Sequence, residues 1–142
     1  MEMFETIKKQ MELDDIDILN YSPLTLAYIG DSVYEVVVRT VIVDEANRSV
    51  DKIHKAASGL VRASAQATIA KAMLDDWTKE EQSVYKRGRN AKVTTKAKNA
   101  TMGEYKAATG FEALIGYLYL TNQTERMLSI IKKGLEILDE IQ

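Results

Sequence analysis

The sequence predicts an all-α fold, and three observations support this prediction. Apolar residues recur at helical spacing near the N-terminus, where Phe4, Ile7 and Met11 would share one helix face. Residues 51–74 are rich in alanine, which has the highest helix propensity. The chain has a single proline, and no segment alternates apolar and polar residues as a half-buried strand does. We therefore expect one helical domain of 142 residues, long enough to bury a core.

The first half of the chain is expected to contain two helices before the alanine-rich stretch. The first spans about residues 4–13. The second begins at Ser22, a good N-cap, followed by Pro23, which is favourable at the first helical position. Its second half, residues 36–43, is β-branched and could form a strand. The apolar pattern continues unbroken from Pro23, and we therefore predict helix to about residue 43.

The second half of the chain is expected to be helical except for one basic loop. The alanine-rich residues 51–74 are predicted as a single helix. Thr78 and Glu81 fit a capping box that starts a further helix, which would end near residue 87. Residues 88–103 are polar and basic without a steady period and are predicted as a loop. The last two helices are predicted over about residues 104–121 and 125–141.

The composition excludes several classes of protein. The chain has no cysteine, so a disulfide scaffold and a thiolate metal site are excluded. Residues 1–5 are acidic and apolar rather than basic, unlike a secretory signal, and charged residues interrupt the longest apolar stretches. The absence of cysteine fits a reducing compartment, and we expect a cytoplasmic protein without a membrane span.

Two carboxylates stand within apolar stretches of the sequence. Asp31 directly follows Gly30, and Glu112 lies four residues before Gly116. An ionised carboxylate is costly to bury unless it is paired or bound to a metal. A glycine inside a helix costs roughly 1 kcal/mol relative to alanine, which a close approach of two helices would offset. If the two helices cross near these glycines, Asp31 and Glu112 would face one another.

Neighbouring carboxylates repel one another, and a hard divalent cation relieves that repulsion. Mg²⁺ takes oxygen ligands, keeps several waters and often uses one or two carboxylates together with a substrate phosphate. Such an ion can activate water and neutralise charge in phosphodiester cleavage. Asp31 and Glu112 are therefore the candidate catalytic residues and Mg²⁺ ligands. The alternative is that both are ordinary helix acids, solvated or paired, as Glu35 is expected to pair with Arg39.

The positive charges are concentrated in one segment. Residues 86–98 contain six Lys and Arg and no acid, and because the formal net charge is −2, the remaining residues carry −8. Such a segment is expected to face an anionic partner. Few aromatics are interleaved, which favours double-stranded RNA, recognised by shape, over stacked single strands. A solvated loop is the alternative. The RNA-binding candidates are Lys86, Arg87, Arg89, Asn90, Lys92, Lys96, Lys98 and Asn99.

Other polar and aromatic residues carry weaker signals. Arg62, Ser64 and Gln66 on the alanine-rich helix could extend the basic surface, but we interpret them as an ordinary exposed face. His54 is the only histidine, so a site with several histidine ligands is excluded, and we interpret His54 as a structural or surface residue. Residues 117–119 are expected in the core or a subunit interface rather than around a cofactor.

Three motifs, present in order, resemble those of the ribonuclease III family. Residues 29–33 (IGDSV) are similar to the family signature, and residues 111–116 (FEALIG) are similar to its second motif. Together with residues 86–92 (KRGRNAK), nearly the whole chain resembles Mini-ribonuclease III, the short branch of the family. The three motifs in this order are far more specific than any one of them alone.

The resemblance implies a fold and an activity. It implies the helical endonuclease domain of ribonuclease III and Mg²⁺-dependent cleavage of double-stranded RNA to 5′-phosphate and 3′-hydroxyl ends, with Asp31 and Glu112 binding the ion. It also implies a homodimer whose two sites cut opposite strands. The implied role is maturation of large-subunit (23S) ribosomal RNA, for which a ribosomal protein is a further candidate partner.

The chain departs from the larger members of this family at three positions. Leu24, Ala27 and Thr109 stand where those proteins have acids, so only Asp31 and Glu112 remain of the usual metal-binding carboxylates. The larger proteins also append a double-stranded RNA-binding domain, which this sequence leaves no room for. Two alternatives stay open: a non-catalytic double-stranded RNA-binding module with a degenerate metal site, and a structural helical protein that dimerises through apolar helices.

Overall fold

Helices make up all the regular structure in the computed structural model, which describes residues 3–45, 49–92 and 100–141. The predicted all-α class is confirmed for these residues. The elements in chain order are α1 (Met3–Gln10), η1 (Ile18–Asn20), α2 (Pro23–Glu45), α3 (Val50–Val61), α4 (Ala63–Met73), η2 (Leu74–Asp76), α5 (Lys79–Arg89), α6 (Met102–Leu120) and α7 (Thr124–Ile141).

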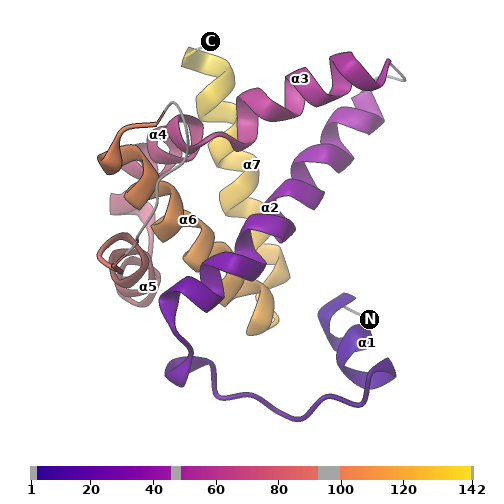
Figure 1. Ribbon diagram of the computed structural model, residues 1–142, viewed down its shortest axis with the longest axis vertical. Coiled ribbons are helices and arrows are strands. Elements are labelled where there is room, and N and C mark those ends of the chain that lie inside the picture. The colour runs from indigo at the N-terminus through magenta and orange to yellow at the C-terminus, as the bar shows by residue number, and fades with distance from the viewer. Residues whose placement is uncertain (1–2, 46–48, 93–99, 142) are drawn as a thin grey trace.

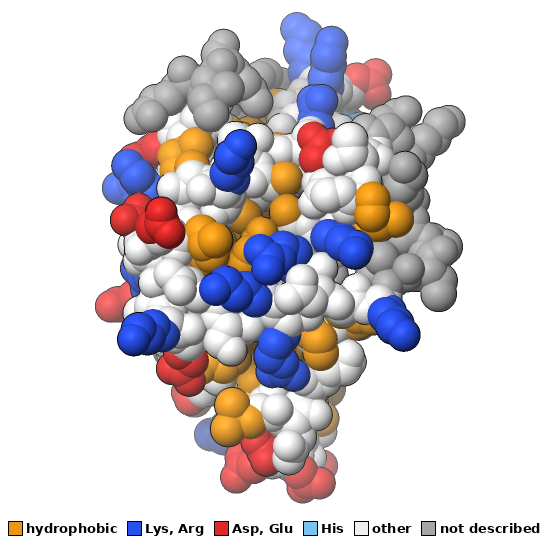
Figure 2. Space-filling view, turned by 90° about the vertical axis from the view of Figure 1, so that its left-hand side faces the viewer, with side chains coloured by type: hydrophobic (Ala, Val, Ile, Leu, Met, Phe, Trp, Pro, Cys, Tyr) orange, Lys and Arg blue, Asp and Glu red, His pale blue; other side chains and the backbone are white. Residues whose placement is uncertain are grey.

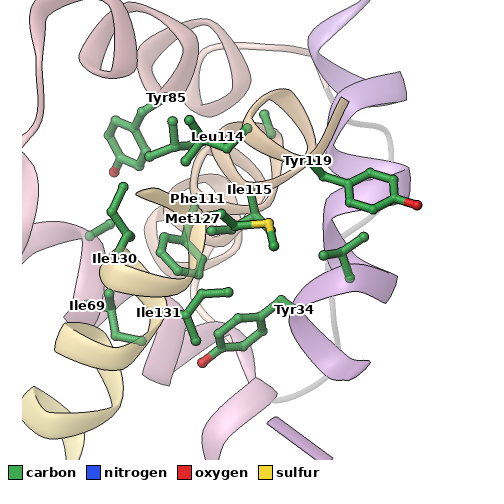
Figure 3. Close-up of a cluster of buried hydrophobic side chains, with 14 of the residues drawn as sticks. Tyr34, Ile69, Tyr85, Phe111, Leu114, Ile115, Tyr119, Met127, Ile130 and Ile131 are labelled. Atoms are coloured by element: carbon green, nitrogen blue, oxygen red, sulfur yellow. The ribbon is translucent and has the colours of Figure 1, made fainter. Parts of the chain in front are cut away.

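Helix α6 is the central helix of the fold. From Ala108 to Tyr119 every residue is buried except Glu112, which is partly exposed. Helices α2, α4, α5 and α7 all pack against α6, and Figure 1 shows α2 crossing it. Figure 3 shows Phe111 and Ile115 of α6 among Tyr34 of α2 and the side chains of α7. The core is therefore built around α6, and Glu112 is the one side chain that interrupts its buried stretch.

Helices α2 and α6 cross in backbone contact at two glycines. A Cβ added at Gly30 would overlap the backbone oxygen of Glu112 and would lie 2.7 Å from the backbone nitrogen of Gly116. A Cβ added at Gly116 would likewise overlap the backbone oxygen of Leu26. Only glycine permits this separation. The close helix approach predicted from the two glycines is confirmed.

A second glycine contact joins α5 to the same part of α6. A Cβ added at Gly88 would lie 2.9 Å from Ala113 Cβ, and one added at Gly110 would lie 2.6 Å from the backbone oxygen of Tyr85. The start of α5 is tied to α7, because both carboxylate oxygens of Glu81 accept hydrogen bonds from Arg126, at 2.8 and 2.9 Å. Helix α5 is therefore fixed at both ends.

The predicted single helix over residues 51–74 is wrong. Helix α3 ends at Val61 and α4 begins at Ala63, because Arg62 between them has an extended backbone (φ −62°, ψ 156°). Helix propensity is high after the break but is lowered before it by Gly59 and Val61, and tertiary contacts add to this local weakness. His54, for which a structural and a surface position were both left open, is exposed on α3.

Side chains satisfy the carbonyl groups that the break leaves free. In a continuous helix the backbone oxygens of Leu60 and Val61 would accept from N–H groups four residues later. Here the Tyr34 hydroxyl donates to Leu60 O at 2.8 Å, and Gln66 Nε2 donates to Val61 O at 2.7 Å. Hydrogen bonds from α2 and α4 thus stabilise the break.

The other boundaries follow the capping signals closely. Ser22 Oγ accepts from Leu24 N at 3.1 Å, and α2 continues as a helix through its β-branched residues to Glu45, as predicted. The capping box of Thr78 and Glu81 is confirmed. The first helix ends at Gln10, three residues earlier than predicted.

The predicted loop is shorter than expected at both ends, since α5 extends to Arg89 and α6 begins at Met102. Residues 93–99 lie outside the described residues. The predicted burial of residues 117–119 is confirmed, and the ring of Tyr119 packs on Phe4 of α1 with centroids 5.3 Å apart. No helix within the described part of the chain is both long and apolar enough to cross a membrane.

Replacing Gly116 tests the importance of the α2–α6 contact. We expect Gly116→Ala to lower the free energy of unfolding by about 3 kcal/mol or more, because the added methyl group would force two backbones apart. Gly103→Ala is the matched control, since its Cβ would lie 4.0 Å from the nearest atom, Thr101 Oγ1. The control should gain up to about 1 kcal/mol from helix propensity. Urea denaturation followed by circular dichroism measures both, and equal stability of the two variants would contradict the contact.

Candidate active site

The α2–α6 crossing brings Asp31 and Glu112 together. Asp31 follows Gly30 on α2, and Gly30 packs on the backbone of Glu112 itself. The Asp31 side chain is exposed, whereas Glu112 is partly buried, and the two carboxyl groups lie within hydrogen-bonding reach. The two acids singled out in the sequence therefore form a pair at a backbone contact. Their roles as catalytic residues and metal ligands remain predictions.

The pair has unusual electrostatics because Glu112 is desolvated. Burial raises the pKa of Glu112 to about 8, and the hydrogen bond and negative charge of Asp31 add to this effect. The hydrogen bond from Gln66 acts in the opposite direction and favours the charged carboxylate. At neutral pH, and without a cation, Glu112 consequently holds a proton.

Gln66 is a third member of the site that sequence analysis placed wrongly. Its side chain is 2% exposed rather than part of an exposed face, and Nε2 donates to Glu112 Oε2 at 3.3 Å. Arg62 is exposed and Ser64 partly exposed. A usable signal was present, because Gln66 shares helical spacing with the apolar Ile69, Ala70 and Met73. The break at Arg62 was the missing information.

The pair fits a cation that needs few protein ligands. Within the described ranges no group of three or more His, Cys, Asp or Glu side chains could hold a metal ion. Two carboxylates suffice for Mg²⁺, which keeps several of its waters. The donor set therefore suits a hard, oxygen-binding divalent ion.

The three substituted acid positions add no further ligand. Leu24 is 40% exposed, and Ala27 is buried in the core. Thr109 is also buried, and its hydroxyl donates to the backbone oxygen of Tyr105 at 3.0 Å. The carboxylate pair thus stands without the additional acids of larger family members.

The basic residues at the end of α5 form a surface near this site. Figure 2 views the side of the molecule on which α5 lies, and Lys and Arg side chains form a band across it. The Arg89 guanidinium lies 5.6 Å from the Tyr85 ring centroid, and Arg87 Nη2 donates to the backbone oxygen of Tyr21 at 3.4 Å. Lys96, Lys98 and Asn99 lie outside the described residues, whereas Lys86, Arg87, Asn90 and Lys92 are exposed and Arg89 partly exposed.

The basic surface and the carboxylate pair share one support. Gly88, between Arg87 and Arg89, packs on Gly110 and Ala113 of α6, which flank Glu112 closely in sequence. Gly30 packs on Glu112 from α2. The exposed basic residues at the end of α5 are therefore held next to the turns of α6 that carry the acid.

Comparisons with known proteins point to one family. The Ribonuclease III domain matches residues 24–123, which include both acids and the end of α5. The Mini-ribonuclease 3 of Clostridium tetani is 44% identical over 125 residues, which cover 87% of this chain and 83% of that protein. The Mini-ribonuclease 3 of Staphylococcus aureus is 42% identical over 127 residues, covering 88% and 93%.

A solved structure supports the similarity in three dimensions. A crystal structure of a Fusobacterium nucleatum protein superposes with a TM-score of 0.77 at 32% sequence identity. The alignment covers 84% of this chain and 96% of that chain. The similarity therefore includes most of the helical arrangement that positions the carboxylate pair.

The raised pKa of Glu112 predicts a pH-dependent stability. Between about pH 4.5 and 8 the folded protein keeps a proton on Glu112 that the unfolded chain has lost, so this group's contribution falls as pH rises. In EDTA, the free energy of unfolding of Glu112→Gln should rise relative to that of the wild type by about 1–2 kcal/mol between about pH 5 and about pH 8.5. This is less than the full ~1.4 kcal/mol per pKa unit, because the side chain is partly solvated. Parallel stability profiles in urea denaturation would contradict the shift.

Proposed function

Because the chain belongs to the ribonuclease III family, and within it to the Mini-ribonuclease 3 proteins, we propose that it is a metal-dependent endoribonuclease that cleaves double-stranded RNA. The observation that carries the proposal is the carboxylate pair at the α2–α6 crossing. Asp31 and Glu112 lie side by side, and the raised pKa of Glu112 marks a site where a positive charge is favoured.

Mg²⁺ is the cation that we propose for this pair. Asp31 and Glu112 would hold the ion, and Glu112 would release its proton when the ion binds. The ion supplies charge neutralisation at the scissile phosphate and activation of water. The protein's own contribution is to hold two carboxylates at a fixed separation, because both are attached to helices in backbone contact.

The end of α5 is the proposed contact for the RNA backbone. Lys86, Arg87, Arg89, Asn90 and Lys92 offer cations and one amide on a surface that shares its support on α6 with Glu112. Such groups suit the phosphates and 2′-hydroxyls of an RNA duplex. Lys96, Lys98 and Asn99 remain candidates for the same contact on sequence grounds.

A homodimer is part of the proposal. One chain offers one carboxylate pair, and two strands need two pairs, which a twofold dimer supplies through one interface. On α2, Tyr28 is 81% exposed and Leu24 40% exposed, and both share helical spacing with Asp31. These apolar side chains beside the site suit a contact with a second copy.

The finer biological assignment follows from the resemblance to Mini-ribonuclease III. We propose maturation of 23S ribosomal RNA in the cytoplasm, with a ribosomal protein as a candidate partner. The alternative is a non-catalytic RNA-binding module, and it is favoured by Leu24, Ala27 and Thr109, which replace acids of larger family members. Cleavage of a plain RNA duplex distinguishes the proposed enzyme from this alternative.

Removing either charge tests the chemistry. Asp31→Asn and Glu112→Gln should each lower single-turnover cleavage of a double-stranded RNA by roughly 10²-fold or more, because a neutral amide binds Mg²⁺ poorly. Duplex binding in Ca²⁺ or EDTA should stay close to wild type. Glu35→Gln is the matched control one turn along α2, where Glu35 pairs with Arg39 at 2.6 Å, and it should cleave normally. Wild-type cleavage by both site variants would refute the assignment.

Removing positive charge from α5 tests the RNA contact. Lys86→Ala with Lys92→Ala should weaken duplex binding at ~0.15 M salt and reduce the slope of log K against log salt by roughly one unit per lost phosphate contact. The control removes the same charge from α7, as Lys132→Ala with Lys133→Ala. Filter binding or fluorescence anisotropy measures both. Equal slopes for the two double variants would show that the end of α5 is only a solvated surface.

A further inference from the structure

We propose that Gln66 is a positioning residue that holds the Glu112 carboxylate in the orientation required for binding the divalent cation with Asp31. The inference rests on the proposed function, because it concerns the cation site of that activity. It starts from the contacts of one buried amide that joins the break between α3 and α4 to the carboxylate pair.

The contacts of Gln66 determine the orientation of its amide group. Nε2 has two hydrogens, and it donates one to Val61 O at 2.7 Å and one to Glu112 Oε2 at 3.3 Å. Rotating the amide by 180° would place Oε1 against the Val61 carbonyl oxygen, and two acceptors would then face each other. The backbone at Val61 therefore fixes which end of the amide reaches Glu112.

The break between the helices makes this arrangement available. Because Arg62 is extended, the Val61 carbonyl is free of the helical bond that it would otherwise accept. From the first turns of α4, Gln66 Nε2 donates one hydrogen bond to that carbonyl and a second one to Glu112 of α6. In a continuous alanine-rich helix the Val61 carbonyl would not be available to Gln66, so the break between α3 and α4 makes this hydrogen bond possible.

A packing role alone does not account for Gln66. Its Oε1 atom is buried with no hydrogen-bond partner, and a buried acceptor in that state costs about 1–3 kcal/mol. An apolar side chain of similar volume, such as methionine, would fill the same space without that cost. The amide gives what methionine cannot, a donor aimed at one oxygen of Glu112, which favours the charged carboxylate that a cation needs.

The test compares Gln66→Met with a matched glutamine elsewhere. Gln82 Nε2 also donates to two backbone oxygens, Leu74 O at 2.9 Å and Trp77 O at 3.2 Å, so Gln82→Met removes equivalent bonds. Binding of Mn²⁺, measured by electron paramagnetic resonance without RNA, should weaken about 10-fold or more in Gln66→Met. It should stay unchanged in Gln82→Met.

Single-turnover cleavage of a duplex RNA gives the second readout. In Gln66→Met the Mg²⁺ concentration for half-maximal rate should rise by about the same factor, while the rate at saturating Mg²⁺ should fall much less. In the Glu112→Gln background, Gln66→Met should have no further effect on Mn²⁺ binding, because Gln66 acts through Glu112. If Gln66→Met does not fold, Gln66→Asn, which withdraws the amide by one methylene, should show the same loss.

The outcomes separate this inference from the proposed function. Unchanged Mn²⁺ binding and Mg²⁺ dependence in Gln66→Met, or an equal loss in Gln82→Met, overturns the inference. If Asp31→Asn and Glu112→Gln still abolish cleavage in that case, the proposed function stands. A wild-type protein that neither binds Mn²⁺ nor cleaves duplex RNA overturns both.

Discussion

The backbone contact between α2 and α6 is the constraint on which the rest of the structure depends. Gly30 touches the peptide of Glu112, and Gly116 touches the backbone of Leu26, so the two helix backbones are in direct contact and neither position has room for a side chain. Asp31 is the residue next to Gly30. Because both carboxylates are attached within one residue of this contact, backbone packing holds the starting points of the two side chains close together. Such rigidity is what a site for a charged transition state requires.

Three residues from other helices contact α6 within two of its turns. Gly30 approaches from α2, Gly88 from α5, and Gln66 from the break before α4. Each is a small or polar exception within an otherwise apolar packing surface, and each contacts or closely neighbours Glu112. The remaining core, with Phe111 and Ile115 against α2 and α7 (Figure 3), keeps α6 in place. These small and polar residues thus lie at the proposed functional site, where departures from regular apolar packing are expected.

The parts of this arrangement that sequence predicts are those with a local cause. Ser22 and Thr78 are helix caps through their own side chains, and the glycines of α2 and α6 are costly unless helices meet there. The break at Arg62 has only a weak local signal, because no proline is present and the nearest glycine, Gly59, lies three residues earlier within α3. It is stabilised by Tyr34 and Gln66, whose contacts exist only in the folded chain. The error at Gln66 follows from it, since a wrong helix phase places a buried side chain outside.

The burial that disfavours a charged Glu112 also favours the binding of a cation beside it. Burial makes the charged form of Glu112 unfavourable, and the neighbouring Asp31 makes it more so, which is why the pKa rises to about 8. The fold holds the pair together despite this, because the buried side chains of α2 and α6 keep the two helices packed at the glycine contact. Under the proposed function, a divalent cation would replace the proton of Glu112 and offset both penalties. Cation binding therefore competes with a proton, and its affinity must rise with pH until Glu112 is fully ionised. The same desolvation that destabilises the empty pair strengthens its attraction for a cation, since charges interact more strongly away from bulk water.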